Sequence, residues 1–75
     1  MNPETAERDI IELIYREPFA PFEVEMKDGQ VLQIRHPRLA INGGGAGFIG
    51  ADGGLVDFEF ADILAIRLRN VEAMA

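Results

Sequence analysis

A chain of 75 residues with no cysteine predicts one small domain, spanning residues 1–75, that draws no stability from disulfides or thiolate-bound metal. Its formal net charge of −6 is opposite in sign to the basic footprint of most nucleic-acid-binding domains. The sequence has neither an apolar run of the roughly 18 residues that a membrane span needs nor a signal-peptide pattern. We therefore expect a soluble cytoplasmic protein with no cofactor and no membrane partner.

The first segment has the pattern of an amphipathic helix over about residues 3–16. Asn2 suits the capping position before the first helical turn. Ile10 and Ile14 lie one turn apart and mark the apolar stripe. Pro18 ends the helix, because proline biases the preceding residue away from helical angles. We interpret this helix as a cap on the open end of a small sheet, with a partner-binding helix as the alternative.

Residues 22–36 have the pattern of a β-hairpin. Apolar and polar residues alternate over 22–27 and again over 31–36, which is typical of strands with one buried face. Asp28 and Gly29 stand between the two runs, and a tight two-residue turn needs the positive φ that glycine adopts. We therefore expect two antiparallel strands joined at this turn.

The rest of the chain predicts three further strands, over about 46–51, 55–60 and 64–69. The first of these is rich in glycine, and Asp52 to Gly54 marks the turn that follows it. The last stretch also fits a helix, but a strand is favoured because four strands would leave a large apolar edge uncovered. Leu39 to Asn42 has the pattern of a short extended continuation of the hairpin.

These apolar faces predict one core and one fold class. The residues expected to be largely buried are Leu13, Ile14, Phe22, Val24, Leu32, Ile34, Phe58 and Ile66. The fold class is mainly β with an N-terminal helix, in the form of a small five-stranded antiparallel barrel.

Some segments suggest catalysis or ligand binding, but each lacks residues that the corresponding chemistry requires. Gly43 to Gly54 is glycine-rich, but no lysine followed by serine or threonine ends it, as a phosphate-binding loop requires. His36 is the only histidine, with no second strong ligand at metal-binding spacing, and is better explained as a strand-end residue bonded to backbone. The chain has no serine and no cysteine to act as nucleophile. We expect a protein that is not an enzyme.

Basic residues gather at the end of the second strand, at Arg35, His36 and Arg38, and Arg67 and Arg69 lie on the last strand. They are candidates for binding phosphate or an acidic partner. The favoured alternative is that basic residues pair with carboxylates across neighbouring strands, each pair contributing a few tenths to about 1 kcal/mol. The carboxylates available for this pairing are Glu23, Glu25, Asp57 and Glu59.

The order of one helix and five short strands resembles the Sm-like fold of the Sm, LSm and Hfq proteins. The resemblance rests on M-K-D-G-Q-V-L at residues 26–32 and V-D-F-E-F-A-D-I-L-A-I at residues 56–66. The second stretch is similar to the end of the family domain, where a strand, a one-turn bend and a short final strand close the barrel. The phrase R-E-P-F-A-P-F, with the D-G and R-H-P that follow it, also resembles a group of short bacterial proteins with no assigned function.

The Sm-like resemblance implies an assembly. In that family the strand before the final bend pairs with the final strand of the next subunit, which implies a cyclic homo-oligomer of about five to seven copies. Its interface would include Val56, Phe58, Phe60, Leu64, Ile66 and Leu68.

The same resemblance implies an RNA site as the alternative. The family holds RNA after the second strand, where this chain offers Asn42 together with Arg35, His36 and Arg38. The family's arginine–glycine pair before the last strand is absent, because Phe60 to Asp62 occupies that bend. We therefore expect a self-assembling structural or interaction module, with an RNA-binding ring as the alternative.

Overall fold

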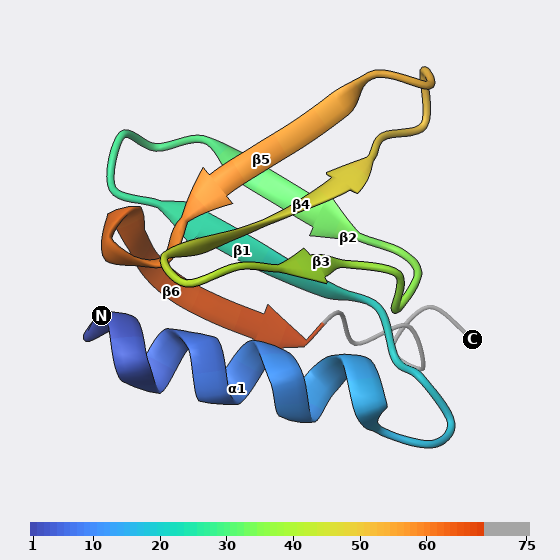
Figure 1. Cartoon of the computed structure of the whole chain (residues 1–75), viewed down its shortest axis with the longest axis horizontal. Coiled ribbons are helices and arrows are strands. Elements are labelled where there is room, and N and C mark those ends of the chain that lie inside the picture. The colour runs from blue at the N-terminus through green and yellow to red at the C-terminus, as the bar shows by residue number, and fades with distance from the viewer. Residues whose placement is uncertain (69–75) are drawn as a thin grey trace.

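A computed structural model describes residues 1–68 of the chain (Figure 1). This part is mainly β with one N-terminal helix, as the sequence predicts. Its elements are α1 (Pro3–Tyr15), β1 (Phe22–Met26), β2 (Val31–Ile34), β3 (Ala40–Ile41), β4 (Gly45–Ile49), β5 (Leu55–Glu59), the 3-10 turn η1 (Phe60–Asp62) and β6 (Ile63–Leu68). The strands form two antiparallel sheets of three, ordered β2–β1–β6 and β3–β4–β5.

The described residues contain six strands rather than the five that the sequence predicts. The additional strand is β3, in which Ala40 and Ile41 pair with Gly47 and Ala46 of β4. The last strand begins at Ile63 and is described as far as Leu68, so position 69 of the prediction lies outside the described residues.

The two sheets are separate ladders within residues 1–68, so the predicted closed barrel is not seen. The second strand was predicted to reach residue 36 but ends at Ile34. Pro37 has no N–H to give to a ladder, and the Leu39 N–H donates back to the Pro37 carbonyl at 3.1 Å. This local turn separates β2 from β3 and divides the strands between two sheets.

The helix forms where its cap and apolar stripe predict it. The Oδ1 atom of Asn2 accepts hydrogen bonds from the backbone N–H groups of Glu4, at 2.8 Å, and Thr5, at 3.3 Å. The buried stripe of α1 lies against η1 and β6 (Figure 1) and consists of Ala6, Ile10 and Ile14. Within residues 1–68, no helix has the length and hydropathy needed to cross a membrane.

The β1–β2 hairpin is confirmed, but its turn is longer than the predicted two residues. Met26 N–H donates to the Gln30 carbonyl at 2.8 Å, and Gly29 N–H donates to the Met26 carbonyl at 3.0 Å. These bonds enclose a three-residue loop in which Gly29 alone has a positive φ, of 94°. The Asp28 carboxylate supports the loop by accepting from Gln30 N–H at 2.9 Å.

The core lies between the two sheets and the helix. Most of the residues predicted to be buried are buried, namely Ile14, Phe22, Val24, Leu32, Ile34 and Phe58. Leu13 and Ile66 pack against this core but are only partly buried. The remaining core members are Ala6, Ile10, Met26, Ala46, Phe60 and Ile63.

Candidate functional site

The first candidate surface is the outer edge of β5, the terminal strand of its sheet. Gly50 N–H donates to the Gly54 carbonyl at 2.8 Å, and Phe60 N–H donates to the Gly44 carbonyl at 3.0 Å. These pairs lie in the β4–β5 register and fix which residues of β5 bond to β4, because hydrogen-bonded and open positions alternate in an antiparallel ladder. The backbone groups that face away from β4 are those of Leu55, Asp57 and Glu59.

The outer edge of β6 is the second candidate surface, because β6 is also a terminal strand. On β1, Met26 donates its N–H toward β2, whereas Lys27 donates its N–H to Asp62, on the β6 side, at 2.8 Å. Odd-numbered residues of β1 therefore bond to β6, where they pair with Ala65 and Arg67. The residues that alternate with these two, Ile66 and Leu68, therefore direct their backbone groups toward the open edge.

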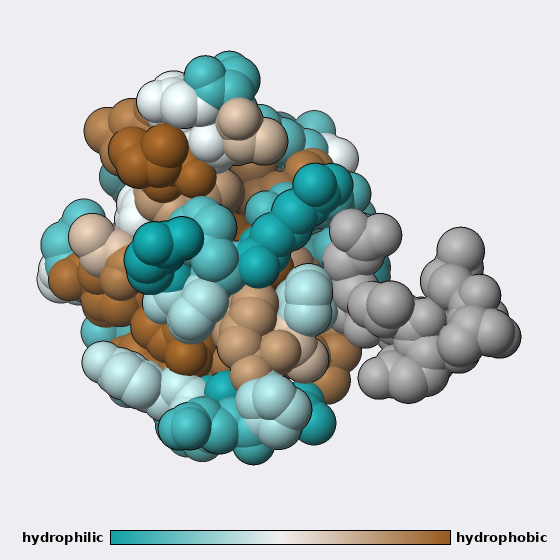
Figure 2. All heavy atoms as spheres, turned by 90° about the vertical axis from the view of Figure 1, so that its right-hand side faces the viewer, coloured by the Kyte–Doolittle hydropathy of each residue, from teal (hydrophilic) through white to brown (hydrophobic). Residues whose placement is uncertain are grey.

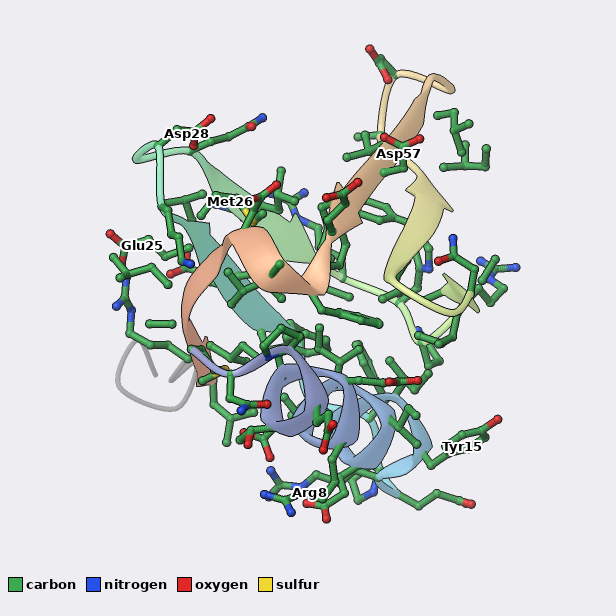
Figure 3. All side chains as sticks on the ribbon, turned by 60° about the vertical axis from the view of Figure 1, so that its left-hand side comes forward. Arg8, Tyr15, Glu25, Met26, Asp28 and Asp57 are labelled. Carbon is green, nitrogen blue, oxygen red and sulfur yellow. The ribbon has the colours of Figure 1, made fainter. Side chains whose placement is uncertain are left out.

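The two edges differ in charge. β5 exposes Asp57 and Glu59, whereas β6 exposes Arg67 and carries no carboxylate. The Arg67 guanidinium donates to Glu25 at 2.6 Å, and its side chain remains 54% exposed. In Figure 3 the labelled Asp57 and Glu25 lie on the outside of the molecule. The β5 edge is therefore acidic, whereas the one charged residue of β6, Arg67, is already paired with Glu25.

The residues that the sequence predicts for an oligomer interface occupy three kinds of position. Phe58 and Phe60 are buried, with ring centroids 6.3 Å apart, so their side chains hold β5 and η1 onto the core. Val56 and Ile66 are partly buried. Leu64 and Leu68 are about half exposed, at 51% and 49%. Sequence patterning marked the apolar faces of these strands but did not identify Leu55, which is 71% exposed.

A groove of about 750 Å³ lies between β2 and the β4–β5 pair. Its apolar lining consists of Val31, Leu32, Phe48, Ile49, Ala51 and Val56. Its basic lining consists of Arg35, His36 and Arg38. Figure 2 faces the side that holds the β4–β5 turn and shows brown hydrophobic surface close to teal hydrophilic surface. The fold thus brings the predicted basic cluster to one end of an apolar groove.

The His36 ring joins the β2–β3 connection to β4. Its Nδ1 atom accepts from Arg38 N–H at 3.3 Å, and its Nε2 atom lies 3.4 Å from the Ile49 carbonyl oxygen. Because Nδ1 is the acceptor, Nε2 carries the proton and donates to Ile49. The ring also meets Phe48 edge-on, at a centroid distance of 6.2 Å. His36 is therefore bonded to backbone, as the sequence predicts, and holds Arg38 beside the groove.

Pairing of basic side chains with strand carboxylates is confirmed for Arg67 and Glu25. Arg35 instead donates to the neutral Gln33 side chain at 2.8 Å. Neither Arg35 nor Arg38 has a carboxylate partner among residues 1–68. The groove therefore carries positive charge that the described part of the chain does not neutralise.

Asn42 lies apart from the three basic residues. Its Oδ1 atom accepts from the N–H groups of Gly44, at 3.0 Å, and Gly45, at 2.8 Å, in the turn before β4. It lines a different hollow, beside the start of α1, which Glu4 and Glu7 also line. The structure therefore brings together three of the four residues predicted for RNA or partner binding, and places Asn42 elsewhere.

Comparison with known proteins gives no match: no protein-family model, no curated protein and no solved structure matches this chain. The structure defines a class, a small β domain with one N-terminal helix and two three-stranded sheets, in which β2, β6, β3 and β5 are the terminal strands of the described residues. The resemblance to the Sm-like family stays a prediction from the sequence.

Proposed function

We propose that this chain is a non-enzymatic, self-assembling structural or interaction module, in which the β5 edge of one copy pairs with the β6 edge of the next. The observation that carries the proposal is that β5 and β6 are unlike terminal strands of two different sheets, and the Sm-like resemblance favours these two over the other terminal strands, β2 and β3. Exposed edges invite pairing with other chains, and monomeric proteins often blunt them with proline. Neither β5 nor β6 contains proline.

The directions of the two edges suit a head-to-tail assembly. β5 and β6 diverge from η1 in both Figure 1 and Figure 3, so a copy bound at one edge leaves the other open. Pairing of unlike surfaces is heterologous, and it yields a ring when the rotation between copies closes. The resemblance to the Sm-like family supports a cyclic arrangement of about five to seven copies.

Pairing would also cover surface that costs free energy to expose. The partly exposed Leu64 and Leu68 of one copy would meet the β5 edge of another, and burial of apolar surface contributes about 25 cal/mol per Å². Asp57 and Glu59 would approach a strand that carries no carboxylate, so no like charge on β6 opposes this orientation. A domain of this size has a small core, so oligomerisation is a common source of added stability.

Two proline variants test the proposal because each removes one edge donor. Asp57→Pro removes an N–H from the β5 edge, and Ile66→Pro removes one from the β6 edge. We expect neither variant to assemble alone. Mixed together, they retain one intact edge each and should form a dimer of twice the 8.3 kDa chain mass, and nothing larger. Size-exclusion chromatography with light scattering measures this.

Asp57→Ala and Ile66→Val are the matched controls, since both keep the backbone N–H and should still assemble. Circular dichroism of all four variants establishes that they are folded. A folded Asp57→Pro chain that assembles like the unmodified protein would contradict the proposal. So would a mixture of the two folded proline variants that stays monomeric.

A further inference from the structure

The groove between β2 and the β4–β5 pair has the size and apolar walls of a binding site. Its volume of about 750 Å³ is within the range of about 300–1,000 Å³ that is typical of ligand sites. Val31 on one wall is 44% exposed and Ile49 on the other is 56% exposed. Both side chains line the groove, and exposed apolar side chains in a groove mark a surface for a partner's apolar group.

The charge of the groove is opposite to the charge of the whole chain. The chain carries a net charge of −6, but the groove lining includes Arg35, His36 and Arg38 and no aspartate or glutamate. The backbone N–H of Arg38 donates to the His36 ring at 3.3 Å, and the residue lines the groove. Guanidinium groups bind carboxylates through paired, charge-assisted hydrogen bonds. The ligand that fits is therefore anionic at one end and apolar where it meets the walls.

We infer that this groove binds an acidic peptide segment that places an apolar side chain between Val31 and Ile49 and its carboxylates against Arg35 and Arg38. The site is formed within one copy of the chain, so the inference goes beyond the proposed assembly and does not depend on it.

The walls favour a peptide over RNA. Single-stranded RNA is held by aromatic faces on which bases stack. Phe48 is the only aromatic side chain besides His36 in the groove lining, and the two rings already meet edge-on. The other walls are mainly aliphatic, which suits leucine or phenylalanine side chains of a peptide.

The test titrates the full chain with an octapeptide of three glutamates, a leucine, a phenylalanine and three glutamates. Two-dimensional nitrogen–proton correlation NMR spectra of the protein are recorded after each addition of peptide, at physiological salt. We expect saturable shifts of the amides of Val31, Arg38, Ile49 and Gly50. Replacing the leucine and phenylalanine by serine tests the apolar walls, and replacing the glutamates by lysine tests the charge. Both changes should weaken binding about tenfold or more.

Charge-reversal variants of the protein localise the site. The double variant Arg35→Glu, Arg38→Glu should weaken binding of the octapeptide at least about tenfold. The double variant Arg8→Glu, Arg16→Glu makes the same change in net charge on the helix and should stay within about twofold, because salt screens distant surface charges. Ile49→Ser should also weaken binding, whereas Tyr15→Ser, at a helix residue that is 77% exposed, should not.

Three results would overturn the inference. The first is an octapeptide that binds no more tightly than its serine counterpart. The second is an equal loss of binding in the two charge-reversal variants, which would show attraction to net charge alone. The third is a single-stranded RNA octamer that shifts the same amides with equal or higher affinity, which would assign the groove to nucleic acid.

Discussion

At the scale of single residues, Gly45 is the position where the packing requires glycine. Gly45 is buried in β4 opposite Glu59, and an added Cβ would fall on the Phe58 carbonyl oxygen and lie 3.2 Å from the Glu59 Cα. These are backbone atoms, so β4 and β5 would have to separate. Gly45→Ala should lower the free energy of unfolding by about 1–3 kcal/mol in denaturant titrations. Gly43→Ala, at a site with open space, should change it by less than about 0.5 kcal/mol.

Ile10 and Leu13 lie on the same helix, but Ile10 is fully buried and Leu13 only partly. Ile10 is 0% exposed, so Ile10→Ala should lower the free energy of unfolding by about 2–5 kcal/mol. Leu13 only packs against the edge of the core, so Leu13→Ala should cost less than half as much. Thermal or denaturant melts measure both. A loss below about 0.5 kcal/mol for Ile10→Ala would mean that the helix is not docked.

At the scale of elements, β6 offers a direct test of which backbone groups face its open edge. The Asp57→Pro background, in which we expect assembly to be blocked, keeps oligomerisation out of the measurement. On this background, Ala65→Pro removes an N–H that bonds to β1 and should cost about 1–3 kcal/mol. Leu68→Pro removes an N–H that faces the open edge and should cost less than about 1 kcal/mol. If denaturant titrations gave equal losses in the free energy of unfolding for the two variants, the assigned β1–β6 hydrogen-bond ladder would be contradicted.

Local patterns predicted the elements better than their arrangement. The helix, the hairpin and the later strands follow from apolar periodicity and from Asn2, Gly29 and Pro18. β3 has only two residues, too few to show alternation, and its pairing with β4 depends on contacts across the glycine turn. The three-residue hairpin loop also depends on a long-range contact, because Lys27 N–H bonds to Asp62.

The candidate surfaces show the same division between local and long-range information. Arg35, His36 and Arg38 are neighbours in sequence, so their clustering was predictable. The apolar wall opposite them comes from β4 and β5, and only the folded chain brings Ile49 to the same groove. Asn42 follows Arg38 by four residues but belongs to the next turn, where its side chain is bonded to backbone.

At the scale of the whole molecule, the charge balance predicts weak interaction with nucleic acid. With a net charge of −6 and only three basic residues together in the groove, the chain should not bind A-rich or U-rich single-stranded RNA tightly at physiological salt. Fluorescence polarisation titrations measure this. A micromolar or tighter affinity that falls steeply with added salt, as counterion release requires, would favour the RNA-binding ring instead.

Assembly of the unmodified chain through its β5 and β6 edges is the central claim, and the mass of the protein in solution tests that claim most directly. Multi-angle light scattering at micromolar concentration should give one species of about five to seven times the 8.3 kDa mass of a single chain. Its mass should stay constant on moderate dilution, because a closed ring leaves no free edge for growth. A species of 8.3 kDa at every concentration would contradict the account and leave a monomer whose β5 and β6 edges are unpaired.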